Sequence, residues 1–159
     1  MSAIALQALA EETGGQLVGE SVALHNLAID SRDVKAGDLF AALSGQRVDG
    51  HDFAPQALAA GASALLTERK LEGLAPQLVV TDVQQASGRF GSLKRQAFEG
   101  KVIAITGSAG KTTTKNLVAA ALATAGQVHA TVGNQNNELG VPITLSGLTS
   151  NHRFGVIEM

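Results

Sequence analysis

The segment from Val102 to Ala125 constrains the fold of this chain more than any other. It opens with the continuous apolar run Val102-Ile103-Ala104-Ile105, passes through a glycine-containing loop at 106–110, and becomes rich in alanine after Lys111. An uninterrupted apolar run is typical of a central parallel strand that is buried on both faces. A strand, a glycine loop and a helix in this order make up half of a βαβ unit. The segment therefore predicts an α/β fold with a parallel sheet.

The loop between the predicted strand and helix has the residues of a phosphate-binding loop. Glycines let the backbone curl, and the free N–H groups and dipole of the following helix attract an anion. Lys111 can reach the terminal phosphates, and the hydroxyl of Thr112 can hold Mg²⁺. The general pattern G-x-x-x-x-G-K-[ST] would place glycine at position 105, where this chain has Ile105, so its loop G-x-x-G-K-T is two residues shorter. The predicted nucleotide-binding residues are Gly107, Ser108, Ala109, Gly110, Lys111, Thr112 and Thr113.

The rest of the chain alternates between helical and strand-like segments that glycines separate. Helices are predicted at 3–13, 55–60, 83–98 and 141–148, and short strands at 17–18, 25–29, 39–43, 64–66, 78–81, 128–131 and 154–157. We expect a boundary near residue 82. This gives a first domain at 1–82, a connecting helix at 83–99 and a second domain at 100–159.

Composition excludes several classes of protein. A net charge of −2 provides no basic surface for nucleic acid, and five Phe with no Trp or Tyr leave few platforms for stacking bases. The absence of Cys excludes disulfides and thiolate metal sites, and fits a reducing compartment. The first twenty residues have no basic region typical of a signal peptide, and no apolar run approaches the roughly 20 residues of a membrane span. We therefore expect a cytoplasmic protein with neither nucleic-acid nor membrane partners.

Several motifs, taken in order, resemble the Mur ligase family of ATP-dependent amide-forming enzymes. They are the loop T-G-S-A-G-K-T-T at 106–113, the segment G-N-Q-N-N-E-L-G-V-P-I-T-L at 133–145, and the N-terminal segments at 30–32, 37–40 and 45–53. The resemblance implies a small N-terminal α/β domain that binds a uridine nucleotide, followed by the start of a P-loop (Rossmann-like) ATPase domain. It also implies a bacterial ligase of peptidoglycan synthesis that uses ATP and Mg²⁺, with UDP-MurNAc-tripeptide and D-Ala-D-Ala as substrates.

The resemblance assigns roles to particular residues. Lys111 and Glu158 are the implied catalytic residues, and Thr112 and Glu158 the implied metal ligands. Glu158 follows the apolar pair Val156-Ile157, so a strand would deliver its carboxylate beside the phosphate loop, where it can coordinate Mg²⁺. The implied residues for the UDP substrate are Ser31, Arg32, Arg47, Asp49, His51, Asn134, Asn136 and Asn137. Which of Arg32 and Arg47 meets the diphosphate stays open, and His25, His129 and His152 are expected to be surface or partly buried residues.

Three other functions compete with this interpretation. They are a different P-loop enzyme such as a small kinase or GTPase, a sister ligase of the same family acting on another UDP-MurNAc-peptide, and a non-catalytic module that binds a UDP-sugar. Residues 100–159 supply three strands at most, whereas a P-loop sheet usually needs about five. We therefore expect an N-terminal fragment that is inactive alone, from an enzyme that is a monomer at full length, with self-association of the fragment as an alternative.

Overall fold

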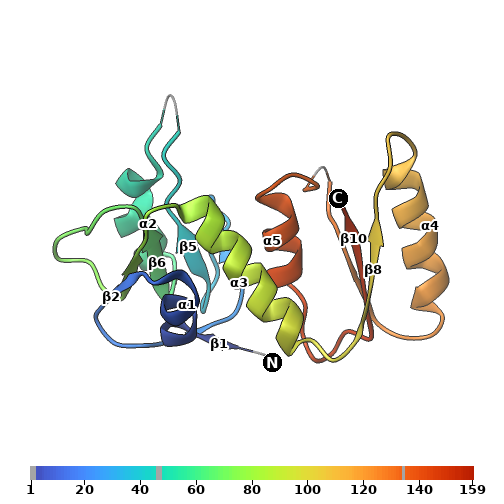
Figure 1. The fold of residues 1–159 in the computed structure, drawn as a ribbon, viewed down its shortest axis with the longest axis horizontal. Coiled ribbons are helices and arrows are strands. Elements are labelled where there is room, and N and C mark those ends of the chain that lie inside the picture. The colour runs from blue at the N-terminus through green and yellow to red at the C-terminus, as the bar shows by residue number, and fades with distance from the viewer. Residues whose placement is uncertain (1–2, 46–47, 134) are drawn as a thin grey trace.

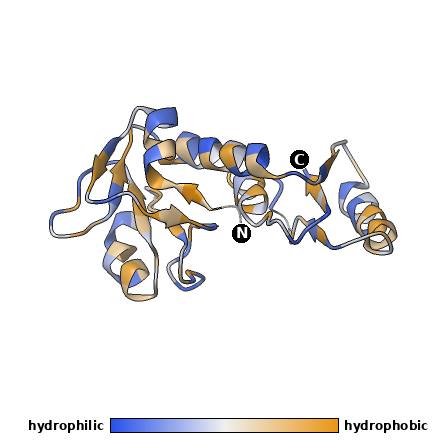
Figure 2. Ribbon diagram, turned by 90° about the horizontal axis from the view of Figure 1, so that it is seen from below, coloured by the Kyte–Doolittle hydropathy of each residue, from blue (hydrophilic) through white to orange (hydrophobic). Residues whose placement is uncertain are grey.

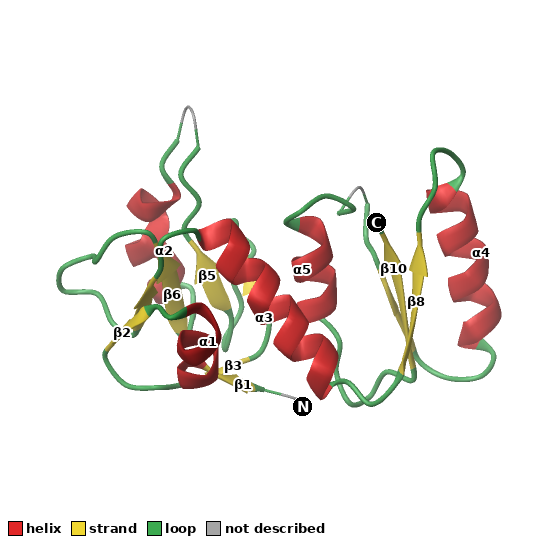
Figure 3. Ribbon diagram, in the orientation of Figure 1, coloured by secondary structure: helices red, strands yellow, loops and turns green. Residues whose placement is uncertain are grey.

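The computed structural model describes residues 3–45, 48–133 and 135–159. Its elements form an α/β fold with two main sheets lying side by side and the helix α3 running between them (Figures 1 and 3). In chain order they are β1 (Ile4–Ala5), α1 (Leu6–Thr13), β2 (Gln16–Val18), β3 (Ala23–Leu24), β4 (Leu27–Ala28), β5 (Leu39–Ala41), the 3₁₀ helix η1 (Gly50–Phe53), α2 (Ala54–Ala59), β6 (Ala64–Thr67), β7 (Gln77–Val79), α3 (Val83–Ala97), β8 (Lys101–Ile105), α4 (Lys111–Ala123), β9 (Val128–Ala130), α5 (Gly140–Ser146) and β10 (Phe154–Glu158).

The first main sheet has five strands in the order β2-β7-β6-β5-β4. It is mixed, because β2 is antiparallel to β7 while the other neighbours are parallel. Successive side chains of a strand point to opposite faces. Leu39 and Leu66 thus join the core beneath α1 and α3, whereas Phe40 and Leu65 join a second core beneath α2. Figure 2 shows these strands as strongly hydrophobic, as expected for a sheet covered on both faces.

The second main sheet has three parallel strands in the order β8-β10-β9. It lies between α5 on one face and α4 on the other (Figure 1). All three strands and both helices predicted for this region are confirmed, but the strand order corrects one expectation. The central strand is β10, which is buried along its whole length, whereas β8 lies at an edge and its residues are exposed or half-buried. An apolar run indicates a strand but does not determine its neighbours.

Two predicted N-terminal elements also differ from the structure. The helix expected at 3–13 begins only at Leu6, because Ile4 and Ala5 form β1 and pair with β3. The strand expected at 25–29 is shorter, because β4 spans only Leu27–Ala28 and His25 lies outside it. The His25 carbonyl has a hydrogen-bond partner outside the sheet, because Nζ of the buried Lys94 in α3 donates to it at 2.8 Å. This contact ties α3 to the first main sheet.

Helix α5 connects the two halves of the chain. It packs closely on α3, and its residue Ser146, which is fully buried, accepts a hydrogen bond at 3.0 Å from the Leu27 backbone N–H of β4. A backbone N–H of an outer strand would otherwise be buried without a partner. The structure thus places β4 against α5. Residues 29–32 follow β4 in the chain, and α5 follows the segment that begins at Gly133.

None of the helices in the part of the chain that the structure describes is long and apolar enough to cross a membrane.

Candidate functional site

The loop between β8 and α4 contains two glycines with positive φ. Gly110 directly precedes α4 with φ of 76°, and Gly107 has φ of 150°. Both values favour glycine. A Cβ at Gly110 would meet no atom within 4 Å, so the conformation, and not the space, requires glycine there. The loop leads into the N-terminus of a 13-residue helix whose first amide groups have no partner within the helix.

Glu158 lies at the end of the central strand and points at the start of α4. The Thr112 hydroxyl donates to its carboxylate, with oxygen distances of 3.1 and 3.2 Å to Oε1 and Oε2. Asn136 Nδ2 donates to Oε1 at 3.1 Å. The structure thus brings together Thr112, Asn136 and Glu158, three residues that the sequence analysis selected from three separate segments. Glu158 itself is only 2% exposed.

A carboxylate and a hydroxyl at the N-terminus of this helix fit a divalent cation. Magnesium takes hard oxygen ligands and is usually held by one or two protein groups together with substrate phosphates and water. Glu158 and Thr112 provide such a pair beside the loop, and Lys111 stands next to them as the first residue of α4.

The other asparagines of the 133–145 segment have different positions. Asn137 Oδ1 accepts a hydrogen bond at 2.7 Å from the Gly140 N–H at the start of α5, so this side chain caps a helix. Asn134 lies outside the described residues, as does Arg47.

Lys115, which no motif in the sequence singled out, also lies beside Glu158. The Lys115 ammonium donates to the Thr131 carbonyl at 2.8 Å and lies 3.9 Å from Glu158 Oε2. Its position in the sequence could have indicated this contact. Residues three apart on a helix share a face, and Lys115 comes three positions after Thr112.

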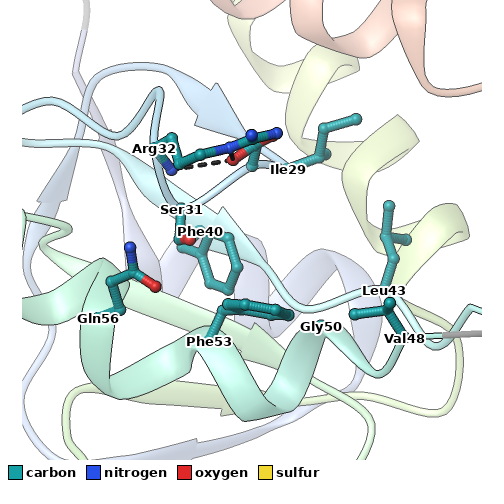
Figure 4. Close-up of a pocket in the computed structure, with 10 residues that line it drawn as sticks. Ile29, Ser31, Arg32, Phe40, Leu43, Val48, Gly50, Phe53 and Gln56 are labelled. Carbon is teal, nitrogen blue, oxygen red and sulfur yellow. Dashed lines mark hydrogen bonds and ion pairs between the residues drawn. The ribbon is translucent and has the colours of Figure 1, made fainter.

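A pocket of about 450 Å³ opens beside the first main sheet. Its apolar side chains include Ile29, Val48 and Phe53, which are unusually exposed for their type, and Phe40 lies next to Phe53 in Figure 4. Phe40, Val48 and Phe53 lie in the segments at 37–40 and 45–53 that were selected from the sequence, whereas Ile29 directly precedes the segment at 30–32. Such a pocket, lined by apolar side chains together with the polar residues Asp30, Ser31, Arg32 and Gln56, suits a small organic ligand.

Two of the predicted UDP-binding residues, Ser31 and Arg32, line this pocket. Ser31 is buried, whereas the side chain of Arg32 is 81% exposed and forms an ion pair with Asp30. The hydrogen bonds from Arg32, first from its side chain and then from its backbone, lower the pKa of Asp30 to about 2. The Arg32 guanidinium, which lines the pocket, is therefore paired with a carboxylate that stays ionised at neutral pH.

Asp49 and His51 form a network beside the pocket and are not among its lining residues. The Glu68 N–H donates to His51 Nε2 at 3.0 Å, so the ring hydrogen resides on Nδ1 and faces Asp49 Oδ1 at 2.6 Å. Asp49 also accepts from the His51 N–H and from Arg69, and these bonds hold its pKa well below the usual range. Because the His51 side chain is fully buried and both ring nitrogens have partners, this pair fixes the loop around Gly50, which does line the pocket.

A second cavity, of about 460 Å³, lies beside the first pocket. It shares Ile29 and Asp30 with the first pocket and reaches Gln135 and Ser146. Gln135 directly precedes Asn136, which contacts Glu158. The second cavity therefore extends from the first pocket to the segment that carries Asn136.

A parallel sheet with a glycine loop, a lysine at the start of the next helix, and an acid on the neighbouring strand define an α/β protein of the P-loop nucleotide-binding class. The model of the Mur ligase family catalytic domain matches residues 23–139, and the chain belongs to the Mur ligase family. Within that family it is homologous to the MurF ligases.

Three relatives illustrate this similarity. The UDP-N-acetylmuramoyl-tripeptide–D-alanyl-D-alanine ligase of Synechocystis sp. is 46% identical over 145 residues, which cover 89% of this chain and 32% of the relative. The solved UDP-N-acetylmuramoylalanyl-D-glutamyl-2,6-diaminopimelate–D-alanyl-D-alanyl ligase of Acinetobacter baumannii superposes with a TM-score of 0.86 at 36% identity, over 100% of this chain and 36% of that one. MurF of Thermotoga maritima, solved in complex with ADP, has a TM-score of 0.69 at 35% identity, over 85% and 32%. The chain spans about a third of the length of these relatives.

Proposed function

We propose that this chain provides the uridine-nucleotide and ATP sites of a ligase that joins D-Ala-D-Ala to UDP-MurNAc-tripeptide. The observation that carries the proposal is the contact between Thr112 and Glu158 at the end of the glycine loop. Homology to the MurF ligases supports the substrates, and the ADP complex of the Thermotoga relative supports an adenine nucleotide as a ligand.

The division of the chain in this proposal follows its two sheets. Residues 1–82 form a domain that binds the uridine nucleotide in the pocket of Figure 4, with Ser31 and Arg32 toward the diphosphate. Residues 83–99 form a connecting helix, and residues 100–159 form the first part of the ATP-binding domain. The second cavity reaches from the uridine-nucleotide pocket to Gln135, next to the Asn136 that contacts Glu158, and in this proposal it takes the peptide of the substrate.

In the proposed reaction, an oxygen of the substrate's terminal carboxylate attacks the γ-phosphorus of ATP and ADP leaves. The amine of D-Ala-D-Ala then attacks the acyl carbon, and phosphate leaves as the amide forms. Lys111 and the loop amides bind and orient the phosphates, whose charge must be stabilised as it shifts toward the leaving ADP. Thr112 and Glu158 would hold Mg²⁺, which when bound neutralises phosphate charge.

Calorimetric titration of the chain with Mg²⁺-ATP tests this proposal. We expect Lys111→Ala to weaken binding at least about tenfold, because a charge-assisted hydrogen bond to phosphate is lost. Lys101→Ala is the matched control, since Lys101 is exposed at the opposite end of β8. In any form of the protein that turns over, Lys111→Ala should lower kcat at least about a hundredfold.

Two results would contradict the proposal. One is equal binding of Mg²⁺-ATP by the wild type and Lys111→Ala, and the other is a preference for guanine nucleotides. A parallel titration with UDP-MurNAc-tripeptide tests the pocket separately. If the tripeptide substrate binds but ATP does not, the chain is a UDP-sugar-binding module.

A further inference from the structure

We propose that Lys115 is a positioning residue that holds the Glu158 carboxylate in the orientation needed for a divalent cation. This inference rests on the proposed function. It starts from an unusual distribution of burial along α4, a helix of which every residue is described. Among the residues of α4, Lys115 is the one that is buried, whereas the apolar Leu117 is 67% exposed. The position that faces the sheet normally holds an apolar residue, so packing alone does not account for a lysine there.

Burying an ammonium group is costly unless hydrogen bonds and an opposite charge compensate it. Lys115 has both kinds of partner. Its Nζ donates to the Thr131 carbonyl at 2.8 Å and lies 3.9 Å from Glu158 Oε2, and the side chains of Lys115 and Glu158 are 6% and 2% exposed. The positive charge is thus directed at one particular carboxylate.

Thr131 connects both members of this pair to the end of β9. Its carbonyl accepts from Lys115, while its hydroxyl accepts from the backbone N–H of Glu158 at 2.9 Å. Lys115, Thr131 and Glu158 therefore form a closed set of contacts that joins α4, β9 and β10. Movement of the Glu158 side chain would break contacts on more than one element.

The carboxylate is held from several directions. Asn136 donates to Oε1, Lys115 lies near Oε2, and the Thr112 hydroxyl reaches both oxygens. Of the two α4 residues, Lys115 is buried and Thr112 is exposed, so Lys115 supports the carboxylate from the interior. Groups that orient a ligating carboxylate typically change metal affinity by about 10- to 100-fold when they are removed.

A purely structural role for Lys115 predicts a different result. If the residue only ties α4 to β9 through Thr131, its loss should weaken ATP binding equally with and without metal. The informative quantity is therefore the ratio of the ATP dissociation constant in EDTA to that in saturating Mg²⁺. We call this ratio the metal dependence.

The experiment measures the metal dependence by calorimetry for the wild-type chain, Lys115→Met and the control Lys101→Met. Circular dichroism and thermal melting establish that each variant is folded. We expect Lys115→Met to lower the metal dependence at least about tenfold, and Lys101→Met to leave it unchanged. Lys115→Arg retains a charged donor and should restore most of it. In a Glu158→Gln background, Lys115→Met should have no further effect, because residues that act through one another are not additive.

A folded Lys115→Met chain with the wild-type metal dependence would overturn the inference and leave the proposed function intact. A wild-type chain that does not bind Mg²⁺-ATP would remove the proposed function and the inference with it. If Lys115→Met does not fold, the ¹⁵N resonance of the Lys115 ammonium in the wild type decides. Adding Mg²⁺ to the ATP complex should shift this resonance more than that of Lys101, and an equal response of the two would overturn the inference.

Discussion

Helix α3 contains two glycines whose replacement by alanine should have opposite effects on stability. Gly88 and Gly91 both lie inside this helix, which spans Val83–Ala97. A Cβ at Gly88 would meet no atom within 4 Å. A Cβ at Gly91 would lie 2.9 Å from the Cα of Pro142 in α5, closer than such atoms approach in proteins. The pair therefore separates helix propensity from helix packing.

The expected magnitudes follow from these two distances. Alanine is better than glycine in a helix interior by about 0.5–1 kcal/mol, so Gly88→Ala should stabilise the chain by this amount. Gly91→Ala has the same gain, but overpacking against a backbone atom costs about 1–3 kcal/mol. Because the propensity term is shared, the two variants should differ by about 1–3 kcal/mol, with Gly91→Ala the less stable.

Urea unfolding followed by circular dichroism measures this difference. A change of 1 kcal/mol corresponds to about 2–4 °C in Tm for a chain of this size, so thermal melting is a second readout. Equal stability of the two variants, within about 0.5 kcal/mol, would refute the argument. It would mean that α5 can move away from α3 at little cost.

Two further predictions concern the contacts of α5 and the histidines. Ser146→Ala leaves the Leu27 N–H buried without its acceptor and should lower the free energy of unfolding by about 1–3 kcal/mol. The control Ser92→Ala, on the exposed side of α3, should change the free energy of unfolding by less than about 0.5 kcal/mol. Urea titration measures both values, and equal stability of the two variants would contradict this prediction. Burial lowers the pKa of His129 and of His152 below the ordinary value of 6.5, so the unfolded chain takes up protons first as the pH falls through that value. Tm should therefore be lower at pH 5.5 than at pH 7.5 and fall less in His129→Gln, whereas an equal or higher Tm at pH 5.5 would contradict the shifts.

Local patterns in the sequence predicted much of the second half of the chain. The strand, glycine loop and helix at 101–123 are encoded within neighbouring residues, because apolar runs, glycines and helix formers act over a few positions. The position of Glu158 at the end of an apolar run predicted its place at a strand end in the same way. The structure brings Thr112 and Glu158 together because neighbouring parallel strands end at the same edge of the sheet.

The tertiary structure alone decided which elements became neighbours. It placed β10, and not β8, at the centre of the second sheet, and it buried Lys115 in a helix that is otherwise largely exposed. It also joined Leu27 to Ser146, which is 119 positions away. The physical reason is that periodicity along the chain records which face of an element is apolar, but not which distant segment covers that face.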